Sequence, residues 1–232
     1  MRFAFSFLVV LTSSLSAATI VQTGNFAFVP NGNRVLTFDD FDTLGGARTL
    51  TGVTVTVVLN KSGGTFSVDN DSTEAGTISL SHDVVGSLTA SGVALLRSDF
   101  SSIGASGTFT ASSGFTTGIA ATSGDDTSSF NNTGAGDYLQ YLATDANATD
   151  SGAIGSPFLS SYEGTGTYTV TINATQSAIA TGLSGLQQAF TVSNVSGSVT
   201  VVYDYIGDPV PEPTAALLGG LGMLLLIRRR RH

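Results

Sequence analysis

The stretch TLTGVTVTVVLN, residues 49–60, decides the fold class of this chain. Its side chains alternate, with Val53, Val55 and Val57 on one face and Thr54 and Thr56 on the other. A period of two is typical of a β-strand with one buried face, and β-branched residues fit a pleated sheet. We therefore predict a strand here whose valines point into a hydrophobic core.

Two later segments repeat this alternation. GTGTYTVTINA, residues 164–174, and GSVTVVYDY, residues 197–205, each place apolar side chains on one face. These side chains are Tyr168, Val170 and Ile172 in the first segment and Val199, Val201, Tyr203 and Tyr205 in the second. We predict that 49–60 and 197–205 pair or face each other across the core. An all-β fold of the β-sandwich type is the economical arrangement.

The remaining sequence predicts shorter strands and loops. NKSGG, residues 60–64, predicts a turn into TFSVDND, which makes a hairpin-like unit. Residues 76–96 predict two or three strands, and residues 110–138, rich in Gly, Ser and Thr, predict long loops around one strand. Residues 180–190 are compatible with a helical turn. No repeat or linker divides this region, so we expect one domain over residues 19–207.

The charge of the chain excludes one class of partner. The segment 34–212 contains all seventeen acidic residues and only four basic ones, a net charge of −13. Such a surface repels phosphate backbones, so we expect no nucleic-acid partner. The chain also lacks cysteine, which excludes thiol catalysis and cysteine-ligated zinc.

Residues 1–18 have the composition of a secretory signal peptide. Arg2 supplies the positive start, residues 3–11 the apolar stretch, and residues 14–18 the small-residue exit. The apolar stretch is too short for a comfortable membrane anchor. We therefore predict export through the Sec machinery and cleavage by signal peptidase after Ala17 or Ala18.

Residues 208–232 form a second predicted signal. Residues 215–227 are uncharged, and as a helix they would be about 20 Å long at ~1.5 Å per residue, against a hydrocarbon core of about 30 Å. The basic cluster that follows would stay cytoplasmic. It consists of Arg228, Arg229, Arg230 and Arg231. We predict a single short transmembrane helix with the domain outside the membrane.

Val210, Pro211, Glu212 and Pro213 stand just before this helix. Proline lacks an N–H and pushes the preceding residue towards extended geometry, the form in which proteases bind peptides. The order of motif, helix and arginine cluster resembles the PEP-CTERM sorting signal of Gram-negative, exopolysaccharide-producing bacteria. This resemblance implies that exosortase, a membrane-embedded cysteine transpeptidase-like enzyme, reads the motif and cuts near it. The membrane-anchored form would then be a transient inner-membrane intermediate.

The domain between the two signals is similar to the choice-of-anchor E family. The matching positions in its first part are Phe41, Asp42, Leu44, Gly45, Leu50 and Val53. YEGTGTYTV, residues 162–170, and VTVVYDY, residues 199–205, match that family's later aromatic strand and its closing strand. Residues 46–48 depart from the pattern by lengthening the first motif. The family name describes a surface domain found with alternative C-terminal anchors, and the resemblance implies no activity.

No catalytic motif stands out in the sequence. His82 and Asp83 could form half of a triad, but no Gly-x-Ser-x-Gly elbow accompanies them. The acidic residues are numerous, but nothing selects a pair for glycosidase chemistry. We expect His82 to be a surface or turn residue that ends the strand at residues 77–81, and we expect a protein that is not an enzyme.

Calcium is the better-motivated ligand, although we expect no required cofactor. Residues 69–74 offer Asp69, Asp71 and Glu74, and hard oxygen ligands at short spacing bind Ca²⁺. Two looser acidic groups are Asp39, Asp40 and Asp42, and Asp145, Asn147 and Asp150. With Asp69 as position one, position six is Glu74, where an EF-hand loop needs glycine. Turns capped by Asp or Asn are the alternative interpretation.

Carbohydrate binding is a further alternative. The chain has no tryptophan, and exposed aromatic side chains near polar loops are the usual platform for sugars. The aromatic residues in or near the loop-rich middle are Phe115, Phe130, Tyr138, Tyr141 and Tyr162. Core or loop-anchoring roles are the competing interpretation for them.

These patterns together predict a non-catalytic, exported protein of the cell surface or extracellular matrix. Its sorting by exosortase would associate it with exopolysaccharide or biofilm. A glycan- or calcium-binding module of the cell surface is the alternative prediction.

Overall fold

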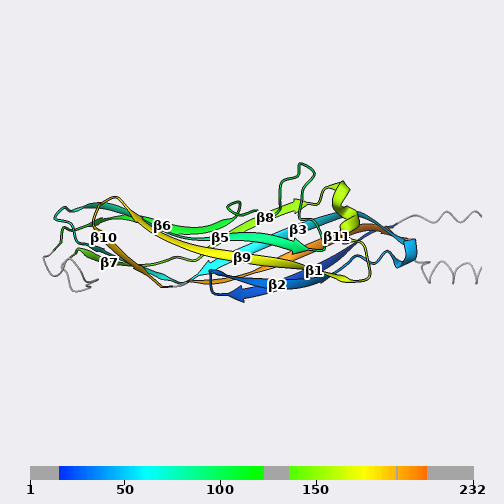
Figure 1. Ribbon diagram of the computed structural model, residues 1–232, viewed down its shortest axis with the longest axis horizontal. Coiled ribbons are helices and arrows are strands. Elements are labelled where there is room, and N and C mark those ends of the chain that lie inside the picture. Colours follow the sequence, from blue (N-terminus) through cyan, green and yellow to red (C-terminus); the bar gives the residue numbers. More distant parts are fainter. Residues whose placement is uncertain (1–15, 123–135, 192, 208–232) are drawn as a thin grey trace, which may run out of the picture.

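A computed structural model describes residues 16–122, 136–191 and 193–207. These residues form an elongated all-β molecule whose strands run along its long axis (Figure 1). The strands are β1 (Ser16–Phe28), β2 (Gly32–Asp39), β3 (Arg48–Ser62), β4 (Thr65–Asn70), β5 (Gly76–Ser91), β6 (Thr110–Ile119), β7 (Tyr138–Leu142), β8 (Ala146–Ala153), β9 (Thr167–Thr181), β10 (Leu186–Phe190) and β11 (Asn194–Gly207). Two short 3₁₀ helices, η1 (Leu44–Gly46) and η2 (Ser156–Tyr162), lie in the connections.

The strands form three antiparallel sheets. The first sheet has the order β1-β11-β3-β8, the second β2-β9-β5-β6, and the third β10-β4-β7. β3 and β11 are neighbours, with Val55 opposite Val201. Of the two predicted arrangements of 49–60 and 197–205, pairing or facing across the core, the structure shows pairing, and the all-β fold class is confirmed.

The main core lies between the first and second sheets. The inward side chains of β3, Val53, Val55 and Val57, are almost completely buried, as the alternation predicts. They pack in one cluster with Val170 and Ile172 of β9 in the opposite sheet. Two layers that share one apolar core in this way form a sandwich.

The third sheet continues the first one along the molecule. The order β10-β4-β7 in the third sheet matches the order β11-β3-β8 in the first. Along the chain, β4 follows β3, β10 precedes β11, and β7 precedes β8. A second core lies between the third sheet and the far halves of β5 and β9. This core contains Phe66, Val68, Ile78, Leu80 and Ile119. The second sheet therefore spans both cores, as its long strands show in Figure 1.

The predicted hairpin over residues 49–71 is wrong, because β3 and β4 belong to different sheets and follow one another in the same line. Gly63 and Gly64, with φ of 70° and 96°, bend the chain without reversing it. These positive φ values favour glycine, so the turn signal in the sequence is real but marks a bend.

Two further expectations, for residues 76–96 and 180–190, also change. Residues 76–96 contain one sixteen-residue strand, β5, where two or three were predicted. Gly86 lies inside this strand. The ring of Phe109 occupies the space that a Cβ would need there, which favours glycine at this position. Residues 180–190 contain the end of β9 and β10 and not a helical turn. In region 110–138, where loops around one strand were predicted, β6 is such a strand, β7 begins at the last residue, and residues 123–135 lie outside the described residues.

The chain enters and leaves the described fold at the same end. β1 and β11 pair along their whole length, and Ser16 lies opposite Gly207. β1 thus begins within residues 14–18, where the sequence predicts the signal-peptide exit. The predicted sorting segment 208–232 follows β11 directly and lies outside the described residues.

Candidate functional site

The predicted sorting motif and basic cluster both fall outside the described residues. These are Val210, Pro211, Glu212 and Pro213, and Arg228, Arg229, Arg230 and Arg231. Within the described ranges no helix has the length and apolar character needed to span a membrane. Along the chain, the motif follows β11, whose last residue is Gly207.

The predicted calcium group lies at the far end of the molecule, at the end of β4. Asp69 is buried, Glu74 is exposed, and Asp71 accepts a hydrogen bond of 2.5 Å from Gln187 Nε2. The residue between the two aspartates, Asn70, shapes the turn. Its Oδ1 accepts hydrogen bonds from the main-chain N and hydroxyl of Ser72. This is the behaviour of an Asn-capped turn.

The two looser acidic groups also support turns and loops. Asp42 Oδ1 accepts the Leu44 N–H at 2.8 Å, and Asp40 Oδ2 accepts the Gly166 N–H at 3.2 Å. Asp145 Oδ1 accepts the Gly63 N–H at 3.3 Å. Among the residues described, no three His, Cys, Asp or Glu side chains are grouped so that they could hold a metal ion. The calcium site stays a prediction.

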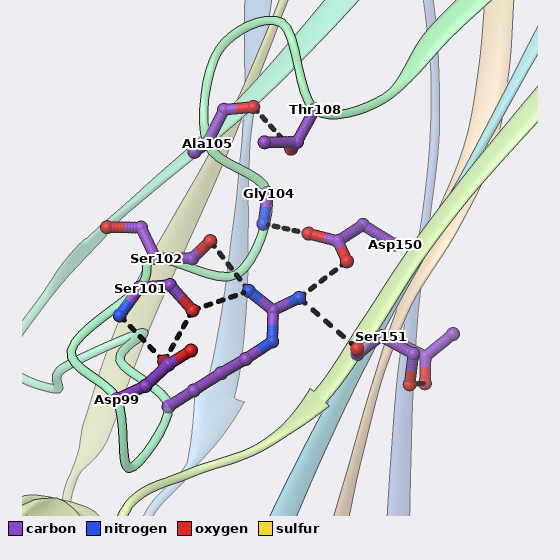
Figure 2. A network of polar contacts seen from close by, with 10 residues as sticks. Asp99, Ser101, Ser102, Gly104, Ala105, Thr108, Asp150 and Ser151 are labelled. Carbon is purple, nitrogen blue, oxygen red and sulfur yellow. Dashed lines mark hydrogen bonds and ion pairs between the residues drawn. The ribbon is translucent and has the colours of Figure 1, made fainter.

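Among these acids, Asp150 forms an ion pair, and its partner is Arg97 (Figure 2). Its Oδ1 lies 2.5 Å from Nη2 of Arg97, and its Oδ2 accepts the Gly104 N–H at 2.7 Å. Arg97 also donates to the carbonyl oxygens of Ser102 and Ser151. Both partners are partly shielded from solvent. The network ties the long loop between β5 and β6 to β8, so it stabilises the loop at one side of the sandwich.

The most unusual chemistry lies at the level where the two cores meet. Four strands there each carry one polar side chain at an inward position: Lys61 on β3, His82 on β5, Ser113 on β6 and Gln176 on β9. Ser193, between β10 and β11, completes this set, which we call the junction cluster. His82 also fills the space beside Gly64, where a Cβ would lie 2.8 Å from His82 Cε1.

Hydrogen bonds connect the junction cluster internally. Lys61 Nζ donates to Ser113 Oγ and, at 3.1 Å, to the carbonyl oxygen of His82. It also lies 3.4 Å from His82 Nδ1. Which of these two nitrogens donates depends on the tautomer of His82.

The expectation that His82 is a surface or turn residue is wrong. Its side chain is 1% exposed and lies in the middle of β5, in phase with the buried Leu80 and Val84. Burial, and next the charge of Lys61, lower the pKa of His82 below its ordinary value. Burial also lowers the pKa of Lys61. A serine hydroxyl beside an amine is the composition of a nucleophile and base, but here burial separates both groups from solvent.

We expect His82 to make the fold sensitive to acid. Because its pKa is lower in the folded than in the unfolded chain, where it is about 6.5, protonation favours unfolding. The free energy of unfolding should therefore fall as the pH drops below about 6.5. Urea unfolding at pH 7.5 and 5.0 measures this, and His82→Gln should reduce the loss between the two pH values. An equal loss in both proteins would contradict the buried, neutral histidine.

Most aromatic positions considered for sugar stacking are packed inside. Tyr162 is fully buried, and Phe115 and Tyr141 face each other at 4.2 Å between ring centroids beside the second core. Tyr138 is partly exposed on β7, and Phe130 lies outside the described residues. The core interpretation thus holds for Tyr162, whereas Phe115 and Tyr141 are partly exposed and pack against the second core.

Tyr162 belongs to a buried aromatic cluster with Tyr168 and Tyr203. The Tyr168 and Tyr203 hydroxyls are 2.7 Å apart, and Tyr203 donates to the Asp39 carbonyl oxygen at 2.9 Å. Phe41 packs against Tyr203 with ring centroids 5.9 Å apart. Burial raises the pKa of Tyr203 to about 12 and also raises the pKa of Tyr162 and Tyr168. All four residues lie in segments that resemble the choice-of-anchor E pattern, and in this fold these four side chains pack in the core.

The outward side of the first sheet offers a different kind of surface. Its side chains form four rows across β1, β11, β3 and β8, and we call it the hydroxyl face. The rows are Val21, Val202, Thr54 and Ala153; Thr23, Thr200, Thr56 and Ser151; Asn25, Ser198, Val58 and Thr149; and Ala27, Ser196, Asn60 and Asn147. All are at least partly exposed, and none is charged or aromatic.

Comparisons with known proteins do not assign this chain to a family. No family model matches it, and no curated protein matches it. A structure of the Gx strain of infectious bursal disease virus is 14% identical and has a TM-score of 0.17, with 94% of this chain and 51% of that chain covered. The T13 particle of the same virus gives 13% identity, 94% and 48% coverage, and a TM-score of 0.11. The chain spans about half the length of these viral chains, and at such TM-scores the likeness carries no argument.

Proposed function

We propose that this chain is an exported, non-catalytic structural protein of the cell surface or extracellular matrix. Exosortase would sort it through Val210, Pro211, Glu212 and Pro213, after Sec export and signal-peptide removal. The observation that carries the proposal is the pairing of β1 with β11, in which Thr19, the first residue after the predicted signal peptide, lies opposite Asp204. A leader before β1 and a sorting segment after β11 would both leave the domain at one end.

This arrangement suits a rod that stands on its C-terminal segment. The third sheet lies at the opposite end of the long molecule (Figure 1). A transient inner-membrane intermediate would therefore hold the domain outside, with the third sheet furthest from the bilayer. Burial of Lys61, His82 and Ser113 supports a structural over a catalytic role for the domain. The protein would then reach the cell surface, or an exopolysaccharide or biofilm matrix, after cutting.

The test is mass spectrometry of the mature C-terminus in cells with and without exosortase. We expect competent cells to yield a protein that ends near Pro213 and lacks the four arginines at 228–231. Cells without exosortase should retain them. Replacing both Pro211 and Pro213 with alanine should also retain the arginines, because the extended peptide that the protease binds is lost.

Pro209→Ala is the matched control, since it removes the proline directly before the motif and should leave cutting unchanged. An intact arginine cluster in competent cells would overturn the sorting proposal. Loss of the cluster in cells that lack exosortase would assign the cut to another protease.

A further inference from the structure

One side-chain amide of the junction cluster is held as the acyl group of a transfer reaction is held. Gln176 Oε1 accepts two hydrogen bonds from Ser193, one of 3.0 Å from its main-chain N–H and one of 2.9 Å from its Oγ. A main-chain N–H on a carbonyl oxygen stabilises the oxyanion that forms when the carbonyl carbon is attacked. Rotation of the serine side chain would bring Oγ from the amide oxygen to that carbon. Ser193 therefore offers both a nucleophile and an oxyanion donor to Gln176.

The nitrogen of the same amide lacks a partner. Among the described residues, Nε2 of Gln176 is buried and makes no hydrogen bond. Buried polar atoms in folded proteins are nearly always paired, so each exception needs an explanation. Loss of this nitrogen as ammonia would remove the unpaired group from the interior. The amide is thus held at its oxygen and left unpaired at its leaving group.

His82 supplies a group that can carry a proton. Its Nε2 is also buried and has no hydrogen-bond partner in the described part of the chain. A Cβ on Gly64 would lie 2.8 Å from His82 Cε1 and 3.5 Å from Ser193 Cβ, so both side chains border the same point. Gln176 pairs with Val84, two residues after His82 on the same face of β5. Hydroxyl, amide and imidazole are therefore neighbours.

Lys61 can select the ring nitrogen of His82 that is free to act as a base. A neutral amine has two N–H donors and one lone pair. Donation to Ser113 Oγ and to the His82 carbonyl oxygen uses both donors, so the lone pair is left for an N–H on Nδ1, 3.4 Å away. In that tautomer Nε2 carries no proton and can accept one. Burial favours the neutral amine because it lowers the pKa of Lys61.

We propose that Ser193 and Gln176 form an ester cross-link within the folded chain. Ser193 Oγ attacks the side-chain carbonyl carbon of Gln176 and gives its proton to Nε2 of His82. A C–O bond forms, the C–N bond breaks, and His82 passes the proton to the departing nitrogen, which leaves as ammonia. One hydroxyl and one amide thus become one ester and one ammonia, and the reaction needs no oxidant or other co-reactant. Lys61 acts through His82 as a positioning residue.

The cross-link would join all three sheets at the level where the two cores meet. Gln176 lies on β9 of the second sheet, and Ser193 lies between β10 of the third and β11 of the first. The chain lacks cysteine, and disulfides are the usual covalent staples of exported domains. Burial does not hinder a reaction within the chain, because both reactants are already in place. The inference goes beyond the sorting proposal and does not depend on it.

The test is the intact mass, under denaturing conditions, of the protein recovered from the producing cells, with both of its ends determined. We expect a mass about 17 Da below that of its own sequence, because acyl transfer to the serine releases one ammonia. Chymotrypsin cuts after Leu183 and Phe190, between the two linked residues, so the peptides that contain Gln176 and Ser193 should appear as one species. Mild alkali should separate them, because it hydrolyses esters and leaves amides intact.

Matched variants locate the bond. Gln176→Ala and Ser193→Ala should each show the full mass of their own sequence and no linked peptides. Gln188→Ala is the control, because Gln188 Oε1 also accepts a main-chain N–H, at 3.1 Å, but from Ala180, which has no hydroxyl. It should keep the mass deficit. His82→Gln should contain at least about tenfold less linked protein, since glutamine cannot carry the proton, and circular dichroism should show that it keeps the β fold.

A wild-type protein with its full sequence mass would overturn the inference without the help of any variant. A deficit that persists in Ser193→Ala would also overturn it, because the ammonia would then come from another site, such as ring closure of Asn31 before Gly32. A linked fraction in His82→Gln equal to that of the wild type would overturn the role of His82. The C-terminal cut is measured on different peptides, so failure here and failure of the sorting proposal are distinguishable.

Discussion

Gly197→Ala is expected to destabilise the fold by at least about 3 kcal/mol, at the upper end of what overpacking a core costs. Gly197 lies on β11 between Phe26 of β1 and Leu59 of β3. A Cβ at this position would collide with the main-chain oxygen of Val58 and lie 2.7 Å from the ring atom Cζ of Phe26. A side chain can rotate away, but a carbonyl in a central strand cannot move without breaking its ladder.

The measurement is urea unfolding of the purified protein followed by circular dichroism. Since domains of this kind are stable by only about 5–15 kcal/mol, the variant should lose a large share of its stability. Gly52→Ala is the control, because it lies on the neighbouring β3 and a Cβ there would lie 3.5 Å from its nearest neighbour, Asp204. It should be neutral or stabilising by up to about 1 kcal/mol. Equal effects in the two variants would contradict the close approach of β3 and β11.

Local sequence pattern predicts the strands of the main core because their alternation is uninterrupted. Val53 to Leu59 on β3, and Tyr168 to Ala174 on β9, keep period two and are buried on the inward side. Alternation fixes which face is apolar in each strand. The choice between pairing and facing stayed open for 49–60 and 197–205, since that depends on contacts distant in sequence.

The junction cluster was missed because polarity was taken as a sign of exposure. Lys61 continues the inward phase of β3, His82 that of β5, and Gln176 that of β9. The phase was therefore present in the sequence as a signal. What the sequence cannot supply is that these polar positions meet at one level, because that requires the register of strands that are not neighbours along the chain.

The hairpin at Gly63-Gly64 fails for a related reason. Two glycines with positive φ are common to tight reversals and to bends. Only the partners of β3 and β4 decide between them, and these partners, β11 and β10, come more than a hundred residues later. The acidic groups in the sequence likewise indicated turns capped by Asp or Asn. The hydrogen bonds accepted by Asp42 and Asn70 show such turns in the structure.

Tyr203→Ala is expected to cost about 3–5 kcal/mol, as removal of a buried aromatic ring does. The Tyr203 side chain is completely buried. Its hydroxyl donates to the carbonyl oxygen of Asp39, so the proton between the two tyrosines comes from Tyr168. The residue thus joins β11 to the end of β2 and to β9, which lie in the opposite sheet.

Tyr203→Phe separates the ring from the hydroxyl. It keeps the packing but leaves the Asp39 carbonyl and the Tyr168 hydroxyl without this partner, so a loss of about 1–3 kcal/mol is expected. Tyr205→Ala is the matched control at the rim, where the ring is only partly buried and lies 5.2 Å from the Arg48 guanidinium. Thermal and urea unfolding should rank Tyr203→Ala as the most damaging and Tyr205→Ala as mild. If Tyr205→Ala were as damaging as Tyr203→Ala, the two sheets would not be held together mainly through the buried cluster around Tyr203.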